Sequence, residues 1–393
     1  MRVVGVIAEY NPFHTGHAHH LREARRLSGA DAVVVVLSSV FTQRGDACIL
    51  PPADRVRMAL SSGVDAVFAL PTLWSVRSAE DYARAGIGLL NGLGCDAVSF
   101  GAETPDFAIL QQIAGFLEEE TEAFRGNLRD ELAKGKSYPA AAAQAAAGLL
   151  PEAETVLAQP NNLLAVSYLR ALLRLNSPME AFPVRRESGY HDHELQAAYP
   201  SAGALRQVIL REGASAVSGH VPETALPYLL RAEQEGRIHR PGALDLLLRE
   251  KLLDGSLDWA ALPDTAEGCE HLLQKAARQY ASREEILQHA KTRRYTYARL
   301  SRICTFALLG MTRSMTADIA EPPCAWLLGF RKESEDLLSE LSKKSSLPIL
   351  GKAADYPEKN APWFQLECRA YDLWSLGTGM PVGMALKQGV AVV

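Results

Sequence analysis

The sequence has few long apolar runs, and none reaches the length of a membrane span. Its longest, residues 32–37 (AVVVVL), is far shorter than the roughly 20 residues that a helix needs to cross a bilayer. The apolar stretch at residues 3–8 follows a single positive charge and ends at Glu9, which matches a signal peptide poorly. We therefore expect a cytoplasmic protein that makes no contact with membranes.

Cysteine is also scarce, with six residues in 393 and no Cys-x-x-Cys pair. This scatter argues for reduced thiols and against a disulfide framework or a zinc ribbon. The sequence contains neither a Walker A loop nor a Gly-x-Ser-x-Gly elbow. The formal net charge of −5 gives no overall attraction to nucleic acid, so an RNA partner would need a local basic patch.

The first hundred residues alternate between apolar runs and amphipathic stretches. Near-continuous runs of Val, Ala and Phe predict strands that are buried on both faces, as in a parallel sheet covered by helices. The predicted strands lie at residues 3–10, 30–39, 64–71 and 95–103, and the predicted helices at 17–29, 52–63 and 80–94. The pattern therefore predicts an α/β fold with a doubly wound, Rossmann-like parallel sheet.

The pattern becomes mainly helical after residue 106. Helices are predicted at residues 110–135, 137–150, 161–175 and 201–213, several more between 222 and 317, and one at 332–345; strands are predicted at 182–188, 324–330 and 347–353. A chain of this length is too long for one ordinary core. We expect a Rossmann-like domain with a helical insertion at residues 1–215 and a mainly α-helical domain at 216–393.

Four histidines lie where the first strand is expected to pass into the first helix. His14 and His17 bracket Gly16 in an HTGH motif. As zinc ligands they would need two further partners with suitable geometry, and Glu9, His19 and His20 lie on the strand end or run into the helix. We predict no metal site here, and we expect His19 and His20 to face solvent.

The position of the HTGH motif favours a phosphate site. The end of the first strand of a parallel sheet is where such folds bind nucleotides, and a helix N-terminus attracts anions. Gly16 removes a side chain so that phosphates can approach the backbone, and the two imidazoles can donate hydrogen bonds during phosphoryl or nucleotidyl transfer. The alternative is a polar turn in which His14 or His17 only caps the helix.

A longer series of motifs resembles one family. The blocks EYNPFHTGH, FTQRGD, RVRMAL, SGVDAVFALP, FGAE, QPNN, RRESGYHD, SAGALR and KTRRYTYARLSR follow one another in order up to about residue 302, and LLGF, SSLPIL and ADY follow in the tail. Together they resemble the bacterial tRNA(Met) cytidine acetate ligases of the HxGH nucleotidylyltransferase superfamily. This resemblance implies that ATP, accompanied by Mg²⁺, and acetate form acetyl-adenylate. The acetyl group then passes to N4 of the wobble cytidine of elongator tRNA(Met).

The resemblance also implies roles for particular residues. His14 and His17 would be catalytic, and the first domain would be the nucleotidyltransferase domain. Gln43 and Arg44 would help to form the acetate or phosphate pocket, unless they belong to a surface loop. The residues implied in ATP binding are Ile7, Ala8, Glu9, Tyr10, Asn11, Pro12, Phe13, His14, Thr15, Gly16, His17, His20, Gly101, Asn161, Asn162, Arg185 and Arg186.

Two of these assignments are paired choices. Adjacent side chains on a strand point to opposite faces, so only one of Arg185 and Arg186 is expected to point into the site. One of Asn161 and Asn162 is expected to cap its helix. A departure from the family lies at Pro52, where family members place a lysine. If that lysine contacts phosphate or RNA, this chain has one cation fewer.

The segment at residues 291–302 is the basic patch that RNA binding would need. Lys291, Arg293, Arg294, Arg299 and Arg302 occur there without an acidic residue, with Tyr295 and Tyr297 between them. Cations and aromatic rings in a helical domain suit phosphate contacts and base stacking, so the resemblance favours tRNA binding over a solvated helix face. His191, Asp192 and His193 offer a weaker acid–base or metal element because no companion ligands have a suitable spacing.

Two other functions remain open from the sequence. One is an adenylyltransferase that makes a soluble nucleotide product, although such an enzyme would not need the additional helical half. The other is a tRNA-binding homologue that has lost its ligase activity, which Pro52 favours.

Overall fold

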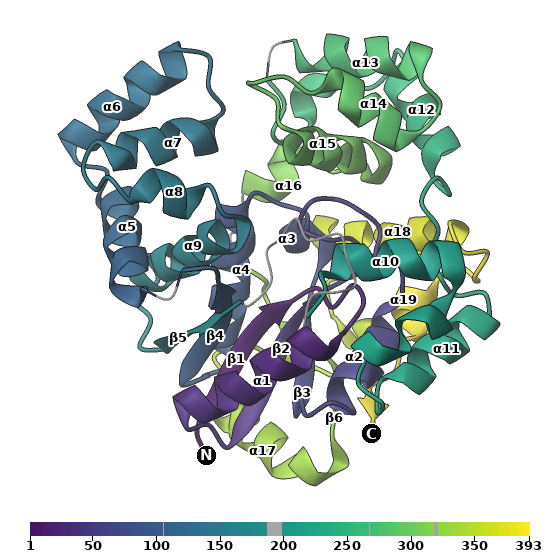
Figure 1. Ribbon diagram of the computed structural model, residues 1–393. Coiled ribbons are helices and arrows are strands. Elements are labelled where there is room, and N and C mark those ends of the chain that lie inside the picture. The colour runs from purple at the N-terminus through teal and green to yellow at the C-terminus, as the bar shows by residue number, and fades with distance from the viewer. Residues whose placement is uncertain (105, 187–198, 267, 318–320) are drawn as a thin grey trace.

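The computed structural model describes residues 1–393 except 105, 187–198, 267 and 318–320 (Figure 1). Five parallel strands form the centre of the sheet in the order β5-β4-β1-β2-β3. They are β1 (Val3–Ala8), β2 (Ala32–Ser38), β3 (Ala66–Leu70), β4 (Ala97–Ala102) and β5 (Glu180–Arg185). The predicted α/β fold with a parallel sheet is therefore confirmed.

Helices connect these strands. Three of them lie at the predicted places: α1 (Thr15–Ser28), α2 (Pro52–Leu60) and α4 (Ala79–Gly92). The short α3 (Thr72–Ser75) was not predicted. Figure 1 shows α1 crossing in front of the strands. All residues of β2 and β3 are buried, as their apolar runs predict. Helix α4 lies close against β1 because Gly86 has no side chain: a Cβ there would lie 2.5 Å from Ile7 Cδ1.

A helical insertion separates β4 from β5. Its helices are α5 (Phe107–Glu119), α6 (Glu122–Ala133), α7 (Tyr138–Ala147), α8 (Ala153–Leu157) and α9 (Pro160–Arg174). The single helix predicted over residues 110–135 is two helices, because Glu120 has a left-handed φ of 43° and the Thr121 side chain caps α6. Arg174 forms ion pairs with Glu80 on α4 and Glu118 on α5, so α9 is tied to both helices.

The chain between residues 202 and 317 is helical, as predicted, in the part that the structure describes. The α-helices are α10 (Ala202–Glu212), α11 (Leu226–Gln234), α12 (Asp245–Leu253), α13 (Cys269–Gln279), α14 (Arg283–Ala290), α15 (Tyr297–Leu309) and α16 (Arg313–Ala317). Short 3-10 helices lie at Ala214–His220 and Trp259–Ala261. No helix among the described residues is long and apolar enough to span a membrane.

The last seventy residues return to the sheet. Strand β6 (Ala325–Phe330) pairs antiparallel with β3, and β7 (Ile349–Leu350) and β8 (Ala391–Val392) pair with β6. Helix α17 (Glu335–Lys344) follows β6, and α18 (Pro362–Leu376) and α19 (Met384–Lys387) precede β8. The sheet therefore takes strands from both sides of the predicted boundary at residue 215.

Helix α18 packs on the edge of the sheet where the parallel strands end. The buried Glu367 carboxylate accepts hydrogen bonds from the Ser39 hydroxyl and, at 2.5 Å, from the Thr72 backbone N–H. The Trp374 indole N–H donates to the carbonyl of Cys48 at 2.6 Å. These bonds hold the loop after β2 in place, and that loop faces the first βα junction.

Candidate nucleotide-binding site

His14 and His17 together cap the N-terminus of α1. The Gly16 N–H donates to Nδ1 of His14 at 3.0 Å, and the His14 N–H donates to Nδ1 of His17 at 3.3 Å. This is the reciprocal arrangement of a capping box, with imidazoles in the places usually taken by Ser or Thr and by Glu or Gln. The two ring centroids lie 3.8 Å apart. The capping turn considered from the sequence is therefore present, and it uses both histidines.

The cap fixes where each ring carries its proton. Because Nδ1 of each ring accepts an N–H, the neutral ring holds its hydrogen on Nε2. Burial, with the charges of Arg186 and Arg206, lowers the pKa of His14 to about 3. Burial and the neighbouring His14 bring the pKa of His17 well below its ordinary value. Both rings are therefore neutral near pH 7, and each presents one Nε2–H donor.

His20 belongs to the same site. Contrary to expectation, it does not face solvent. Its Nε2 lies 3.1 Å from the hydroxyl of Ser99 in β4, and burial lowers its pKa to about 4. His19 is half-buried and stacks on Tyr199 with ring centroids 5.1 Å apart. The expectation was wrong because α1 crosses β4 as well as β1, so more of its surface is covered than one strand would cover.

The residues between β1 and α1 are fixed by neighbours from distant parts of the chain. Tyr10 has a left-handed φ of 45°, is buried, and packs on Phe13 and His17 with ring centroids 4.8 Å away in each case. The Asn11 side-chain oxygen accepts the N–H of Ile49 at 2.8 Å, and its carbonyl accepts from Arg206 at 2.7 Å. The motif is therefore a rigid turn.

Glu9 and Arg55 join the ends of β1 and β2. The Glu9 carboxylate accepts the Gln43 N–H at 2.7 Å, and burial raises the pKa of this carboxyl group. The fully buried Arg55 guanidinium donates to the carbonyls of Glu9 at 2.8 Å and Ser38 at 2.9 Å. Backbone carbonyls thus satisfy a buried cation, which keeps the edge of the sheet in one conformation.

Gln43 has an anchoring role in this structure. Its backbone N–H is bound to Glu9, and its side-chain amide donates to the Arg77 carbonyl at 2.5 Å. Arg44 is half-buried beside it. The acetate or phosphate pocket predicted for Gln43 and Arg44 remains a prediction.

Gly101 and Arg186 meet at the ends of β4 and β5. Arg186 donates to the side-chain oxygen of Asn161 at 3.2 Å, and its charge lowers the pKa values of His14, His17 and His20. Gly101 makes room for this side chain, since a Cβ there would lie 3.2 Å from Arg186 Cγ. Arg185 is exposed.

The arginine nearest the histidines is therefore Arg186, as alternation along a strand requires of one of the pair.

Neither Asn161 nor Asn162 caps α9, which corrects the expectation for this pair. The N-cap is Gln159, and both asparagines lie inside the first turn. The Glu103 carboxylate accepts the N–H of Asn161 at 3.2 Å and of Asn162 at 2.7 Å, so the cap comes from the loop after β4. Asn162 is buried and accepts the N–H of Glu103, whereas Asn161 joins Glu103 to Arg186.

Sequence reasoning missed three residues near the histidines: Ser99, Arg206 and His220. Arg206 lies on α10 and holds the carbonyl of Asn11. The charges of His220 and Arg206 also lower the pKa of His14. Arg206 is part of the SAGALR block, so its motif was visible in the sequence although its contact with the first turn was not.

The basic segment 291–302 divides into exposed and engaged cations. Lys291, Arg293 and Arg294 are exposed. Arg299 donates to the carbonyl of Asp264 at 2.6 and 2.8 Å, and Arg302 pairs with the Asp264 carboxylate at 2.8 Å. Arg299 and Arg302 therefore fasten α15 to the loop before α13.

The tyrosines of this segment are not open stacking platforms. Tyr295 is buried, with the Arg299 guanidinium 5.0 Å from its ring centroid. Tyr297 is half-buried and its hydroxyl donates to the Glu284 carboxylate at 2.5 Å. The expectation of base stacking fails for Tyr295, because the ring packs in the helical core that surrounds α15.

The other candidates from the sequence lie away from this site or outside the described residues. His191, Asp192 and His193 fall in the range that the structure does not describe. Pro52 is the buried first residue of α2. Among the described residues, no three His, Cys, Asp or Glu side chains are grouped as a metal site would require.

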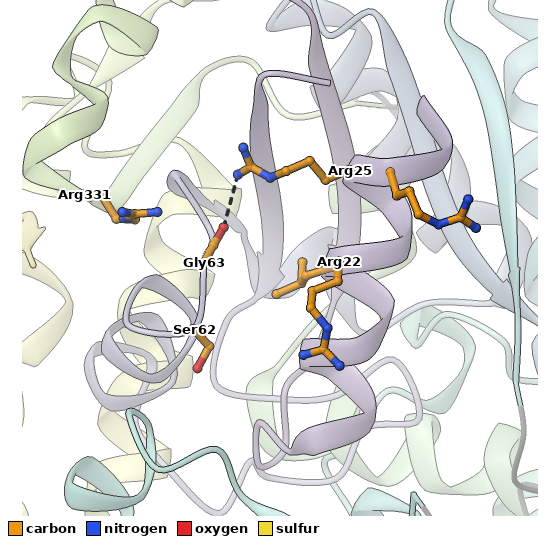
Figure 2. Close-up of a pocket in the computed structure, with 7 residues that line it drawn as sticks. Arg22, Arg25, Ser62, Gly63 and Arg331 are labelled. Atoms are coloured by element: carbon orange, nitrogen blue, oxygen red, sulfur yellow. Dashed lines mark hydrogen bonds between the residues drawn. The ribbon is translucent and has the colours of Figure 1, made fainter. Parts of the chain in front are cut away.

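A surface hollow lies between α1 and the turn after α2, away from the HTGH motif. Figure 2 shows Arg22, Arg25 and Arg331 around Ser62 and Gly63. Arg25 pairs with Asp65 at 2.6 Å, and Arg331 lies 3.8 Å from the same carboxylate. Asp65 balances part of the positive charge in the hollow. The hollow lies before the start of β3, whereas nucleotides bind where the parallel strands end, so the HTGH motif is the better placed phosphate site.

Comparison with known proteins places this site in a family. The sequence profile of the family described as HIGH Nucleotidyl Transferase matches residues 1–388. The tRNA(Met) cytidine acetate ligase of Thermoanaerobacter sp. (strain X514) is 31% identical over 384 residues, covering 96% of this chain and 95% of the relative. The enzyme of the same description from Acetivibrio thermocellus is 33% identical over 395 residues, covering 95% and 94%.

A solved structure agrees over the whole length. TmcAL of Thermotoga maritima superposes in its apo form with a TM-score of 0.92 at 26% identity, and in a form bound with alpha-thio ATP with a TM-score of 0.89 at 27% identity. Each comparison covers 100% of both chains. The chain belongs to the HIGH nucleotidyl transferases and, among them, to the tRNA(Met) cytidine acetate ligase family.

Proposed function

We propose that this chain is an ATP-dependent ligase that acetylates N4 of the wobble cytidine of elongator tRNA(Met) through acetyl-adenylate. The observation that supports this most strongly is the pair of neutral imidazoles at the N-terminus of α1. Both rings lie within reach of the charge of Arg186, at the edge of the sheet where parallel strands end. Relatives of the same length carry the corresponding names.

The first reaction joins acetate to the α-phosphate of ATP. A carboxylate oxygen of acetate attacks the α-phosphorus in line, and pyrophosphate leaves. Nε2–H of His14 and His17 would donate to phosphate oxygens whose charge grows in the transition state. The positive end of the α1 dipole and the charge of Arg186 would attract the same phosphates.

The second reaction transfers the acetyl group. The cytidine N4 amine attacks the acyl carbon, AMP leaves, and the amine loses one proton. No covalent intermediate with the protein is required.

Mg²⁺ bound to ATP would neutralise part of the phosphate charge. Mg²⁺ takes oxygen ligands and usually keeps phosphate oxygens and water in its shell, with only one or two carboxylates from the protein. Glu9 is the one carboxylate in the EYNPFHTGH motif and could supply such a ligand. The neutral histidines would remain hydrogen-bond donors.

The exposed cations of the helical region supply the proposed tRNA contact. Lys291, Arg293 and Arg294 lie between α14 and α15 and are open to solvent. Arg299 and Arg302 would act indirectly because Asp264 holds both.

The decisive experiment is mass spectrometry of tRNA(Met) after incubation with the protein, ATP and acetate. We expect one acetylated cytidine at the wobble position, and pyrophosphate release from ATP that requires acetate. Pyrophosphate release that does not depend on acetate would contradict the proposal. Unmodified tRNA(Met) after incubation with the protein, ATP and acetate would contradict it as well.

An inactive tRNA-binding homologue is the second candidate, favoured by Pro52 where the family places lysine. That protein would bind ATP and tRNA without releasing pyrophosphate.

A further inference from the structure

A tight turn at residues 42–46, which we call the QRG turn, lies between the nucleotide site and the helical region. The Thr42 N–H donates to the Asp46 carbonyl at 2.8 Å, and the Gly45 N–H donates to the Thr42 carbonyl at 2.9 Å. A β-bridge between Phe41 and Ala47 closes the base of the turn. With this internal bonding, the QRG turn can move as a unit.

One end of the QRG turn binds the nucleotide motif. The Gln43 N–H donates to the Glu9 carboxylate at 2.7 Å, and this carboxylate directly follows β1. Glu9 is half-buried, which leaves less water to replace this bond, so the position of Gln43 influences the position of the carboxylate.

The other end of the QRG turn binds two helices. The Gly45 carbonyl accepts from the Arg283 guanidinium at 2.9 Å and from the Thr305 hydroxyl at 2.6 Å. Gly45 has a left-handed φ of 87°, and a Cβ there would lie 2.8 Å from Thr305 Oγ1 and 3.1 Å from the Ser301 carbonyl oxygen. Glycine at this position therefore permits both the turn and the close contact with α15.

Arg283 is the centre of this contact. It is the first residue of α14, and besides the turn it binds the Ser301 carbonyl at 2.9 Å and the Thr305 hydroxyl at 3.0 Å on α15. It also lies 3.8 Å from the Asp46 carboxylate. A single guanidinium thus joins α14, α15 and the QRG turn.

The exposed cations are attached to these same two helices. Lys291 directly follows α14, and Arg293 and Arg294 lie in the short connection to α15. RNA bound to these three residues would therefore hold the two helices that hold Gly45.

We propose that Arg283 is a positioning residue that aligns Glu9 with the reacting groups when tRNA docks on residues 291–294. This inference rests on the proposed function. The contacts from the tRNA surface to Glu9 are few. Arg283 joins α14 and α15 to the Gly45 carbonyl, and Gln43, two residues before Gly45, binds Glu9. Displacements of about an ångström at a reacting centre can cost a hundredfold in rate, so a short path of this kind can control acetyl transfer.

Arg313 offers a control within the helical region. Like Arg283, it binds backbone carbonyls, those of Leu262 at 2.9 Å and Thr265 at 2.5 Å, although Arg313 is exposed whereas Arg283 is half-buried. These contacts stay within the helical region and do not include the QRG turn. R313A therefore tests the effect of weaker packing within the helical region. R283A tests the contact between the helices and the QRG turn.

The experiment measures three quantities for the wild type, R283A, R313A and T305V. They are the Kd for tRNA(Met), the rate of acetate-dependent exchange between pyrophosphate and ATP without tRNA, and the single-turnover rate of acetyl transfer at saturating tRNA. For R283A we expect transfer to fall roughly tenfold or more, with the Kd and the exchange rate within about twofold of the wild type. T305V should give a smaller loss of the same kind, and R313A none at saturation.

Two outcomes would overturn the inference. One is a transfer rate in R283A that recovers fully when tRNA is saturating. The other is an equal loss in R313A, because Arg283 would then only stabilise the helices. T305V removes one hydroxyl at a buried site and decides the question if R283A does not fold.

Hydrogen–deuterium exchange separates this inference from the proposed function. Addition of tRNA should change exchange in the segment from Glu9 to His17 of the wild type, and R283A should remove that change. If the wild type transfers no acetyl group, the proposed function fails. Hydrogen–deuterium exchange still tests whether tRNA binding is transmitted through Arg283 to Glu9. Exchange in that segment that does not respond to tRNA would overturn the connection.

Discussion

At the residue scale, the capping histidines can serve the helix and a ligand at the same time. A capping Ser has a single oxygen, which the helix occupies, whereas imidazole has a second polar atom on the far side of the ring. In this chain Nδ1 of His14 and His17 serves the helix, which leaves each Nε2–H as a donor. The same bonds orient the donors before ATP arrives, and such preorganisation is where much catalytic stabilisation originates.

Substitutions that keep the cap but displace the N–H donor from its place on the imidazole ring should separate stability from activity. Asn is among the best N-cap residues, and Gln is usual at the third position of a capping box. We expect H14N and H17Q to change the free energy of unfolding by less than about 1 kcal/mol. Acetate-dependent pyrophosphate release should fall about 10²- to 10³-fold in each. H14A is the control that should lose both stability and activity. Wild-type pyrophosphate release in H14A would exclude His14 as a donor.

His14 also makes the free energy of unfolding depend on pH. The pKa of His14 is about 3 in the folded chain and near 6.5 when unfolded, so between these values the unfolded chain binds more protons. Stability should therefore fall as the pH falls below 6.5, by up to about 1.4 kcal/mol per pH unit for this group. Urea unfolding at pH 7 and pH 5 checks this: H14N should lose about 2 kcal/mol less than the wild type over that range. An equal loss in both proteins would contradict the assignment.

At the element scale, the alternation of side chains at the end of β5 sets which arginine serves the site. Arg186 lies by the histidines against Gly101, and the adjacent Arg185 is exposed. We expect R186A to weaken ATP binding about tenfold or more, because a charge-assisted contact to phosphate is lost. R185A should leave it within about twofold. Titration of ATP binding for both variants tests this, and equal effects would show that neighbouring charge alone matters.

Strands β1 to β4 and the helices between them were predictable because their signal is local. Continuous apolar runs, with glycines after the helices, mark each boundary within a few residues. The details at the helix ends were not predictable in this way. Glu103 caps α9 from 58 residues upstream of Asn161, and His20 meets Ser99 79 residues away. Neither spacing leaves a periodic pattern. The sequence therefore predicts that Asn161 or Asn162 caps α9, whereas Glu103 from the loop after β4 provides the cap.

At the scale of the whole molecule, the sheet extends beyond the first part of the chain. The apolar run at residues 324–330 predicted a strand, but an apolar run does not identify its partner or direction. Strand β6 pairs antiparallel with β3, and the buried Glu367 of α18 binds Ser39 and Thr72 at the edge of the sheet. The predicted helical character between residues 222 and 317 is confirmed in the described part. Helix α18 of the tail holds the loop after β2, which faces the first βα junction.

The basic segment illustrates the same limit for the candidate RNA contact. Five cations without a neighbouring acid predicted one continuous patch, yet Asp264 lies 38 residues before Arg302 and binds it. Folding thus brings a carboxylate to a segment that has none in its own sequence. The three cations that stay exposed, Lys291, Arg293 and Arg294, are those nearest the connection between α14 and α15.

This division predicts two different responses to mutation. Each cation that contacts an RNA phosphate releases counterions, so the logarithm of affinity falls with the logarithm of salt concentration by about 0.7 to 0.9 per contact. Removing Lys291, Arg293 and Arg294 together should reduce the slope by about two to three, measured by fluorescence anisotropy of labelled tRNA(Met) over a range of KCl concentrations. R302A should instead lower the melting temperature and leave the slope within about half a unit, because Asp264 already neutralises that charge. An R302A slope change as large as that for one exposed cation would mean that the ion pair opens when RNA binds, and the whole segment would then be the contact surface.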